Sequence, residues 1–296
     1  MDNVRSFTVG IVIPTHNRCS YLRTLLIQIQ AQVIISNLTI ITTVIIDGST
    51  DGTLEMINCE FPSINIIQGD GGLWWTKSIN LGLKLNLAEG YDFSLLMNDD
   101  CELKENFVQT LWSDYLSIGK RCILGSISVS IEDYRRIVSA GTYQPSRFLR
   151  LKSYFFTSRY KDLTDLDIKL ARTYSLSGRG TLIHSDILNE IGLLNENLPQ
   201  YGSDDEFVLR CLEKNVDAYI SFQSVVYTYS GLTSKERTDL SFKVFTKSVF
   251  SKYSALSISK YYHIIKPRTH VILRPISVLM YLLATFLVYV LRRIKN

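Results

Sequence analysis

Residues 92–102 read Asp-Phe-Ser-Leu-Leu-Met-Asn-Asp-Asp-Cys-Glu, a short apolar run that ends abruptly in three polar residues. The run from Phe93 to Met97 has the length and the polar bounds of a strand that is buried on both faces of a sheet. Asp99 and Asp100 follow it at the carboxyl end, where open α/β sheets bind ligands. Adjacent carboxylates repel each other, and oxygen ligands of this kind suit Mg²⁺ or Mn²⁺. The stretch therefore predicts a cation site that could carry a diphosphate, although Asn-Asp-Asp is also common in turns.

Three more strands precede this one, and helices are predicted between them. The strands are expected at residues 7–13, 38–46 and 63–67, and the helices at residues 21–33, 53–58 and 74–87. This alternation predicts βαβ units and a mostly parallel sheet with right-handed crossovers. Polar residues follow each strand, namely Thr15, Asp47, the glycine loop 69–72 and Asp100. Such a rim suits a nucleotide, with Asp47 accepting hydrogen bonds from a base or ribose, although Asp is also common in turns.

Residues 103–232 have a less regular pattern, which indicates a mixed half of the same domain. The expected elements are a helix at 105–117, strands at 121–130 and 136–140, a glycine-broken strand at 176–183, and helices at 185–191 and 204–214. Residues 145–170 give no assignment. We therefore assign residues 1–232 to one α/β domain, with a nucleotide-binding half (1–102) and an acceptor half (103–232).

Two common motifs are excluded. A dinucleotide-binding Gly-x-Gly-x-x-Gly would follow the first strand, where this chain has Pro-Thr-His-Asn-Arg (14–18). A calcium loop that starts at Asp47 would need Glu at its twelfth position, which is Asn58 here. The five cysteines show neither disulfide nor zinc spacing, which favours a reducing compartment. Because the chain opens without a signal-peptide pattern, we expect it to stay in the cytoplasm.

The tail, residues 233–296, is basic, aromatic and apolar. From Lys235 onward, twelve Lys and Arg face two acids, whereas the preceding residues hold 20 basic and 26 acidic side chains. Its clean apolar run, residues 276–291, would make a helix of about 24 Å, short of the roughly 30 Å of a bilayer core. Basic flanks suit an anionic membrane surface, so an interfacial helix is expected, with a packed helix or a true span as alternatives. The apolar run argues for lipid and against nucleic acid.

Seven segments follow one another in an order that is more specific than any single motif. They are Val-Ile-Pro-Thr-His-Asn-Arg (12–18), Asp-Gly-Ser-Thr-Asp-Gly-Thr (47–53), Gly-Gly-Leu-Trp-Trp-Thr-Lys-Ser-Ile-Asn-Leu-Gly (71–82), Leu-Leu-Met-Asn-Asp-Asp (95–100), Gly-Arg-Gly-Thr-Leu-Ile (178–183), Ile-Gly-Leu-Leu-Asn-Glu-Asn-Leu-Pro (191–199) and Tyr-Gly-Ser-Asp-Asp-Glu-Phe-Val-Leu-Arg (201–210). In this order they resemble the family 2 glycosyltransferases of the GT-A fold, over roughly residues 7–230. The Leu-Trp-Trp and Gly-Ser-Asp-Asp-Glu-Phe segments are most similar to the rhamnosyltransferase-like branch that builds cell-surface polysaccharides.

The resemblance implies inverting transfer of a sugar from a nucleotide diphosphate donor to a hydroxyl, with Mg²⁺ or Mn²⁺. Asn98-Asp99-Asp100 stands where the family has Asp-x-Asp, which gives the metal to Asp100. Asp204 matches the family's base position, and Arg179, Asp205 and Glu206 are expected on the acceptor side. The residues expected at the donor are Thr15, Asn17, Arg18, Asp47, Gly71, Gly72, Trp74, Trp75, Lys77, Asn98 and Asp99. Asp47 lies one place after the first Asp of the usual pair, where this chain has Ile46.

This division of labour is chemically sound, because a metal stabilises a departing diphosphate and one base opposite it gives inversion without an enzyme nucleophile. We therefore predict a hexosyltransferase, peripheral at the cytoplasmic face of the inner membrane. It would move a sugar, rhamnose from dTDP-rhamnose being the leading candidate, to a polyprenyl-linked glycan of O-antigen or capsule. A sugar-nucleotide pyrophosphorylase and a non-catalytic nucleotide-sugar-binding membrane scaffold stay open as alternatives. The oligomeric state is open, and a homodimer is compatible with the sequence.

Overall fold

A computed structural model describes residues 5–134, 136–143, 152–153, 168–229, 241–267 and 269–295. Its main sheet has the strand order β10-β12-β6-β11-β4-β1-β2-β3, with β5 paired to β12 and β7 to β6. The strands are β1 (Phe7–Thr15), β2 (Leu38–Asp47), β3 (Asn65–Gly69), β4 (Phe93–Leu96), β5 (Cys101–Leu103), β6 (Cys122–Ser130), β7 (Ile137–Ser139), β10 (Leu170–Arg172), β11 (Thr181–His184) and β12 (Asp217–Thr228). A separate pair joins β8 (Thr142–Tyr143) and β9 (Lys152–Ser153).

The two halves of the sheet differ in strand direction, as the sequence predicts. Strands β4, β1, β2 and β3 are parallel to one another. Strand β11 is antiparallel to both of its neighbours, β4 and β6, whereas β6 and β12 run parallel. Because the carboxyl ends of the parallel strands meet at one edge, Thr15, Asp47 and Asn98 to Asp100 are brought together there. The predicted α/β fold class is confirmed.

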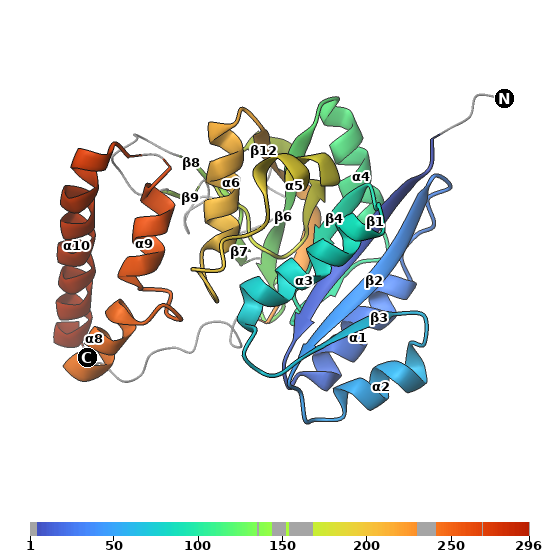
Figure 1. Cartoon of the computed structure of the whole chain (residues 1–296), viewed down its shortest axis with the longest axis horizontal. Coiled ribbons are helices and arrows are strands. Elements are labelled where there is room, and N and C mark those ends of the chain that lie inside the picture. Colours follow the sequence, from blue (N-terminus) through green and yellow to red (C-terminus); the bar gives the residue numbers. More distant parts are fainter. Residues whose placement is uncertain are drawn as a thin grey trace.

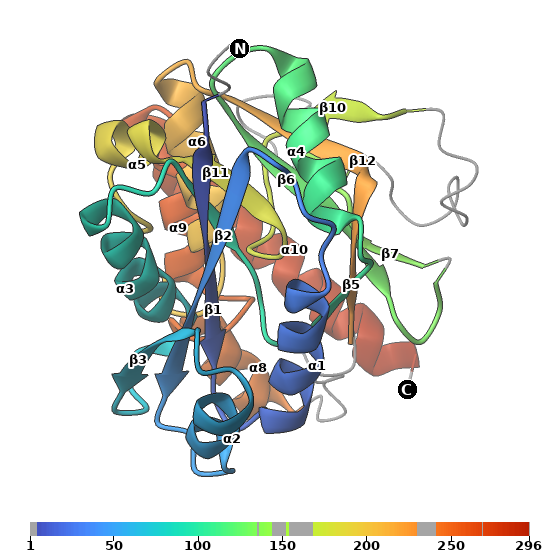
Figure 2. The ribbon, with the colours of Figure 1, turned by 90° about the vertical axis from the view of Figure 1, so that its right-hand side faces the viewer.

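Helices cover both faces of this sheet, and alternate side chains of a strand pack against the helices of one face and then of the other. The helices are α1 (Cys19–Gln30), α2 (Thr53–Glu60), α3 (Trp74–Ala88), α4 (Phe107–Ile118), α5 (Ser185–Ile191) and α6 (Ser203–Glu213). On β1, Ile11 and Ile13 point into the core with α1, α2 and α4, whereas Val12 points into the core with α3, α5 and α6. Figure 2 shows the sheet between these two helical layers.

Strand β12 is the main element that the sequence did not predict. It pairs with β6 along most of its length, and its register shifts between Ser221 and Val225. The pattern is obscured because buried hydroxyls replace apolar residues: Ser221 donates to Asp114, and Ser224 is bonded to Ser126. Apolar alternation is the signal for a strand, so buried serines remove it. The predicted strand at 176–183 begins only at Thr181, and the residues before it form a loop beside the cleft described below.

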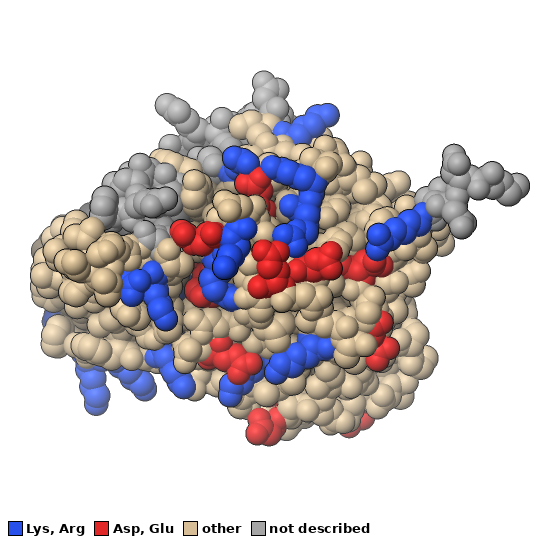
Figure 3. All heavy atoms as spheres, turned by 45° about the horizontal axis from the view of Figure 1, so that its top comes forward, with Lys and Arg blue, Asp and Glu red and all other residues tan. Residues whose placement is uncertain are grey.

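The C-terminal helical unit (residues 241–295) stands beside α6 (Figure 1). It contains α8 (Phe242–Phe250), α9 (Ile258–Ile265), the short η2 (Val271–Leu273) and α10 (Arg274–Lys295). The sequence of this unit has ten Lys and Arg and no Asp or Glu. Figure 3 shows blue side chains along the lower left edge of the molecule, where the unit lies. The predicted domain boundary at 232/233 lies outside the described residues, so it stays a prediction.

Helix α10 is longer than the apolar run counted from the sequence. It has 22 residues, or about 33 Å of helix, and the stretch Val271–Ile294 is long and apolar enough to cross a membrane. One stripe, made of Ser277, Tyr281, Thr285 and Tyr289, is buried in the unit. The ring of Tyr281 stacks on Tyr261 of α9 at 4.2 Å. The opposite face, which is apolar, is exposed.

Candidate active site

A cleft of about 330 Å³ opens at the carboxyl ends of the parallel strands. The residues that line it come from the ends of β1, β2 and β4, from the start of α3 and from the loop before α6. They are Pro14, Thr15, His16, Arg18, Asp47, Gly71, Trp74, Trp75, Ser78, Asn98, Asp99, Asp100 and Gln200. The cleft therefore gathers residues that lie as far as 186 positions apart, most of which the sequence predicts at the donor.

Asp99 and Asp100 are buried at the floor of this cleft. Arg18 bridges them, with its Nη1 at 2.8 Å from Asp99 Oδ1 and at 3.2 Å from Asp100 Oδ2. The pKa of Asp99 is raised to about 6, chiefly by burial and in smaller part by the Asp100 carboxylate, against the opposing effect of Arg18. The predicted repulsion between the two acids is thus relieved in part by a guanidinium from the loop after β1.

A second arginine approaches Asp100 from the opposite half of the domain. Arg179 Nε lies 3.7 Å from Asp100 Oδ1, and its side chain is largely buried. This Nε–H has no hydrogen-bond partner among the described residues. A buried donor without a partner is costly unless a ligand accepts from it. The position therefore suits an anion, such as a phosphate oxygen, next to Asp100.

Asp47 holds the glycine loop in place. Its Oδ1 accepts from the backbone N–H of Gly71 at 2.8 Å, and its Oδ2 accepts from Leu73 and Trp74, each at 3.0 Å. Carboxylates at the start of a helix satisfy backbone donors that have no partner within the helix. Asp47 thus fixes the wall of the cleft, a function distinct from the base or ribose contact predicted from the sequence.

Replacing Asp47 by Asn should lower the free energy of unfolding by about 1–3 kcal/mol, because an amide group turns one acceptor oxygen into a donor that faces backbone N–H groups. Urea denaturation of both proteins measures the difference. Asp70→Asn is the matched control, since the exposed Asp70 accepts one bond from Gly72 in the same loop. Its change should stay within about 0.5 kcal/mol. Equal losses in the two variants would contradict this function of Asp47.

The two tryptophans at the start of α3 have different surroundings. Trp75 is partly buried, and its Nε1–H donates to Asn98 Oδ1 at 2.8 Å. Its ring packs on Gly178, where a Cβ atom would lie 2.0 Å from the indole, so only glycine fits there. Trp74 has a positive φ of 59° and is 44% exposed at the mouth of the cleft. Trp75 thus orders Asn98, whereas Trp74 offers an open aromatic face.

Asp204 lies in the first turn of α6 and is tied to the loop that precedes β11. Its Oδ2 accepts from the backbone N–H of Gly178 at 3.2 Å, and its Oδ1 accepts from Asp205 N. Asp204 does not line the cleft itself. It is joined to the cleft through Gly178, which touches Trp75, and through the next residue, Arg179, which touches Asp100.

The two acids after Asp204 have unlike surroundings. Burial and the adjacent Asp204 carboxylate raise the pKa of Asp205 to about 7, while Lys260 lowers it. Glu206 is buried and gives both carboxylate oxygens to Arg210 Nε, each at 3.0 Å. The Arg210 guanidinium also donates to the carbonyls of Ile191 and Leu193. Glu206 therefore has a structural ion pair, and we leave it out of the acceptor side.

Other predicted donor residues hold the rim or lie outside the cleft. Asn17 bonds with its backbone N–H to Ser49 and with its Oδ1 to the N–H of Thr50, which ties the loop after β1 to the turn after β2. Gly72 and Lys77 are exposed and do not line the cleft. Four lining residues that the sequence prediction left out are Pro14, His16, Ser78 and Gln200. The ring of His16 bonds to the backbone carbonyl of Asp47.

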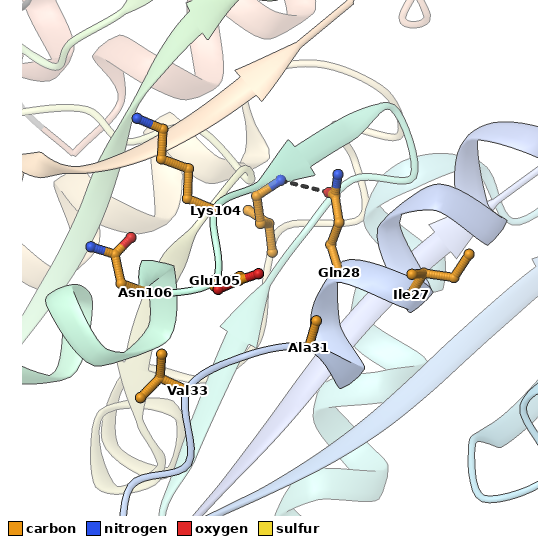
Figure 4. A pocket seen from close by; sticks show the side chains of 8 residues that line it. Ile27, Gln28, Ala31, Val33, Lys104, Glu105 and Asn106 are labelled. Atoms are coloured by element: carbon orange, nitrogen blue, oxygen red, sulfur yellow. Dashed lines mark hydrogen bonds between the residues drawn. The ribbon is translucent and has the colours of Figure 1, made fainter.

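A second, larger hollow of about 570 Å³ lies between the end of α1 and the loop after β5. Figure 4 shows Ile27, Ala31 and Val33 around it, with a hydrogen bond between Gln28 and the backbone of the facing strand. That bond runs from Leu103 N to Gln28 Oε1. Because its lining holds a single carboxylate, Glu105, and no strand-end acids, it lacks the chemistry of the first cleft.

Comparisons with known proteins agree with this fold. A family model described as "Glycosyl transferase family 2" matches residues 10–192. The fold is similar to GalNAc-T7 crystallised with UDP, GalNAc and Mn²⁺, at a TM-score of 0.60 and 16% identity, over 76% of this chain and 43% of that one. It is also similar to S. aureus TarS 1-349, at a TM-score of 0.53 and 17% identity, over 87% of this chain and 69% of that one. For the complex of TarS 1-349 with UDP, the TM-score is 0.55 and the identity 15%, over 87% of this chain and 70% of that one. This chain thus spans less than half of the GalNAc-T7 chain, and at these identities the likeness shows the fold alone. No curated protein matches the sequence.

Proposed function

The chain belongs to glycosyl transferase family 2, and on that premise we propose that it transfers a sugar, with inversion, from a nucleoside diphosphate to an acceptor hydroxyl. The observation that carries the proposal is the link between two acids that are distant in the sequence. Asp100 contacts Arg179, and Asp204 accepts a hydrogen bond from the backbone N–H of Gly178, the residue before Arg179. Both acids therefore attach to one short segment beside the cleft, as one reaction centre requires.

The carboxylates of the cleft fit a divalent cation whose coordination is completed by the substrate. Among the described residues no group of three or more His, Cys, Asp or Glu could hold a metal alone. Mg²⁺ is commonly held by one or two carboxylates together with phosphate oxygens, and Asp99 and Asp100 offer that number. Such a cation would stabilise the charge of the leaving diphosphate. Arg18 and Arg179 are placed to bind phosphate oxygens beside it.

The remaining chemistry needs a base for the acceptor hydroxyl. Asp204 is partly exposed and shares the start of α6 with Asp205, so a hydroxyl can approach it. As Asp204 takes the proton, the hydroxyl oxygen bonds to the anomeric carbon while the bond to the diphosphate breaks. This single displacement inverts the sugar, and no enzyme residue has to bond to it. Trp75 and Asn98 fix the side of the cleft between the two acids. Asp205 forms the acceptor side in this proposal, whereas Arg179, which the sequence predicted on that side, is assigned to the donor phosphates.

The donor and the acceptor are proposed from sequence and surface. The resemblance of Leu-Trp-Trp and Gly-Ser-Asp-Asp-Glu-Phe to rhamnosyltransferases makes dTDP-rhamnose the first donor to test. UDP sugars come second, because UDP occupies the similar GalNAc-T7 and TarS structures. A polyprenyl-linked glycan is the proposed acceptor, in O-antigen or capsule synthesis, since the C-terminal helical unit has a surface suited to lipid. Five free cysteines favour the cytoplasmic side.

Donor hydrolysis tests this function directly. The purified protein is incubated with dTDP-rhamnose, UDP-glucose, UDP-GlcNAc and GDP-mannose, each with Mg²⁺, with Mn²⁺ and with a chelator. Release of a nucleoside diphosphate from one donor, stimulated by a divalent cation, is the expected result. Cleavage between the two phosphates with a nucleoside monophosphate product, or binding without turnover for every donor, would overturn it.

Helix α10 supports a membrane-bound location in this proposal. Its exposed face carries large apolar side chains, among them Leu279, Leu283, Leu287 and Leu291, while its hydroxyl groups face the protein. Large exposed apolar patches mark interaction sites. Ten basic residues and no acid in the unit add attraction to anionic lipid. We therefore propose that α10 meets the cytoplasmic leaflet with this face.

Replacing Leu283 and Leu287 together by Glu should lower the partition constant onto vesicles with 30 mol% phosphatidylglycerol by at least about tenfold. Each leucine that becomes buried in the lipid contributes about 1.5–3 kcal/mol to binding. Flotation of the full chain measures it. The control is Ile34→Glu with Leu116→Glu, which charges two exposed apolar residues of the α/β domain. Equal binding by both variants would contradict the membrane face. Substitution is preferred to deletion of residues 271–296, because α10 also covers Tyr261 of α9.

A further inference from the structure

The C-terminal helical unit touches the cleft through an aromatic pair. Tyr253, between α8 and α9, lies against Trp74 with ring centroids 4.3 Å apart and an interplanar angle of 32°. Trp74 lines the cleft, and its left-handed backbone is a conformation that bulky residues rarely adopt. Such strain persists only where surrounding contacts hold it. Tyr253 is one of those contacts, so the orientation of this wall depends on a residue of the C-terminal unit.

The same unit touches the start of α6 through Lys260. The Lys260 chain crosses Gly202 so closely that a Cβ there would lie 2.8 Å from Lys260 Cε. Its Nζ lies 6.0 Å from the ring centroid of Tyr201. These two residues join Gln200, which lines the cleft, to the first turn of α6 with Asp204. Lys260 therefore lies across the loop between the cleft and the proposed base.

The charges around the proposed base come from three elements. On α6 they are Asp204, Asp205 and the Glu206–Arg210 pair. From the loop before β11, Arg179 follows the residue that bonds to Asp204. From α9, Lys260 lowers the pKa of Asp205, and His263 lies near Glu206 and bonds to Asn195. Among the described residues, Lys260 is the cation of the C-terminal helical unit that acts on Asp205.

We propose that the C-terminal helical unit forms one wall of the active site, where Lys260 positions the carboxylates at the start of α6 and Tyr253 positions the indole of Trp74. The proposal rests on the glycosyltransferase function proposed above and deepens it. Lys260 and Tyr253 are positioning residues, since they act through Asp204, Asp205 and Trp74. The unit is then a working part of the site in addition to a membrane anchor.

The proposal links the membrane to the site by a short path. Tyr261, next to Lys260 on α9, stacks on Tyr281 of α10, and the Tyr281 hydroxyl donates to the carbonyl of Leu256. Helix α9 thus has the site on one side and the membrane-facing helix on the other. Lipid that holds α10 also holds α9, and with it Lys260. We therefore expect anionic vesicles to raise turnover, and this increase to need Lys260.

The experiment compares full-length Lys260→Met, Lys260→Arg, Tyr253→Ala and Tyr253→Phe with Lys247→Met, which removes an exposed cation of α8. Removing the cation that lowers the pKa of Asp205 keeps this neighbour of the proposed base protonated to higher pH, so the acid limb of the donor-hydrolysis profile should move upward by about one pH unit. At pH 6.5 turnover should fall about three- to tenfold. Lys260→Arg should restore the profile, because it keeps the charge. Tyr253→Ala should raise the donor KM about threefold or more, and Tyr253→Phe should not.

A second measurement separates this inference from the function on which it rests. Hydrogen exchange at residues 199–206 reports the order of the loop under Lys260 whether or not a donor has been found. Faster exchange there in Lys260→Met than in Lys247→Met supports the wall. Unchanged exchange together with an unchanged pH profile would overturn it, even in an active enzyme. A protein that hydrolyses no donor, but shows the change in exchange, would overturn the proposed function and leave the contact standing.

Discussion

Replacing Asp100 by Asn is expected to lower donor hydrolysis about 10²- to 10³-fold and to abolish its stimulation by Mg²⁺ or Mn²⁺. Asp100 is fully buried at the cleft floor, with one oxygen facing Arg18 and the other facing Arg179. Removing its charge takes away half of the carboxylate pair that would hold the cation. It also leaves two guanidinium groups with less to balance them. Electrostatic groups that stabilise a developing charge are worth about this much in rate.

Two measurements make this result specific to the cation. Titration calorimetry of the nucleoside diphosphate should show weaker binding in Asp100→Asn with Mn²⁺ present, and little change when a chelator replaces the metal. Thermal unfolding shows whether the variant is folded. Glu190→Gln is the control, because it removes an exposed carboxylate that pairs with Arg121 and does not line the cleft. An Asp100→Asn enzyme that still responds to Mn²⁺ would remove the metal from this residue.

The place of the cleft was predictable from the sequence for a simple reason. In a parallel sheet every strand delivers the next residue to the same edge, so Thr15, Asp47 and Asp100 converge whatever the loops do. The sequence shows the ends of those strands as changes from β-branched to polar residues. Successive side chains of a strand point to opposite faces of the sheet, so the strand pattern also implied a core on each face. Local pattern was enough, because each of these facts depends on neighbouring residues.

The contacts made by the cleft residues were not predictable in the same way. Asp47 was expected at the ligand and does line the cleft, but the sequence did not show that its oxygens accept from backbone groups that lie 24 to 27 positions further along. Arg179 meets Asp100 because β11 inserts antiparallel between β4 and β6, a pairing that no local pattern encodes. Tyr253 and Lys260 belong to a region whose composition favoured the membrane, with a helix packed on the domain as an alternative. Long-range pairing decides these contacts, and a single sequence carries little signal for it.

The orientation of α10 shows a similar limit. Its composition predicted membrane association, but counting the apolar run treated all of its sides alike. The structure shows that Ser277, Tyr281, Thr285 and Tyr289 recur every fourth residue and form the buried face. Residues at this spacing share one side of a helix. A helix with polar groups facing the protein and leucines facing outward suits contact with an apolar environment.

Asp204→Asn is expected to lower donor hydrolysis about 10²- to 10⁴-fold, because a carboxylate that takes the proton of the attacking hydroxyl contributes about this much. Binding of the nucleoside diphosphate with Mn²⁺ should stay within about twofold, since Asp204 does not line the cleft. This combination separates it from Asp100→Asn, which loses binding and rate together. Thermal unfolding is the check on the fold, because Asp204 also accepts from Gly178.

Asp205→Asn decides which carboxylate is the base. The raised pKa of Asp205, about 7, means that it holds a proton over much of the acid range, next to an acid that must be ionised to act. Replacing Asp205 by Asn removes the group whose pKa is raised, so the acid limb of the donor-hydrolysis profile should move to lower pH. Turnover above pH 7 should then stay within about threefold of the unmodified enzyme. A larger loss for Asp205→Asn than for Asp204→Asn would instead place the base one residue later, at the carboxylate that Lys260 approaches.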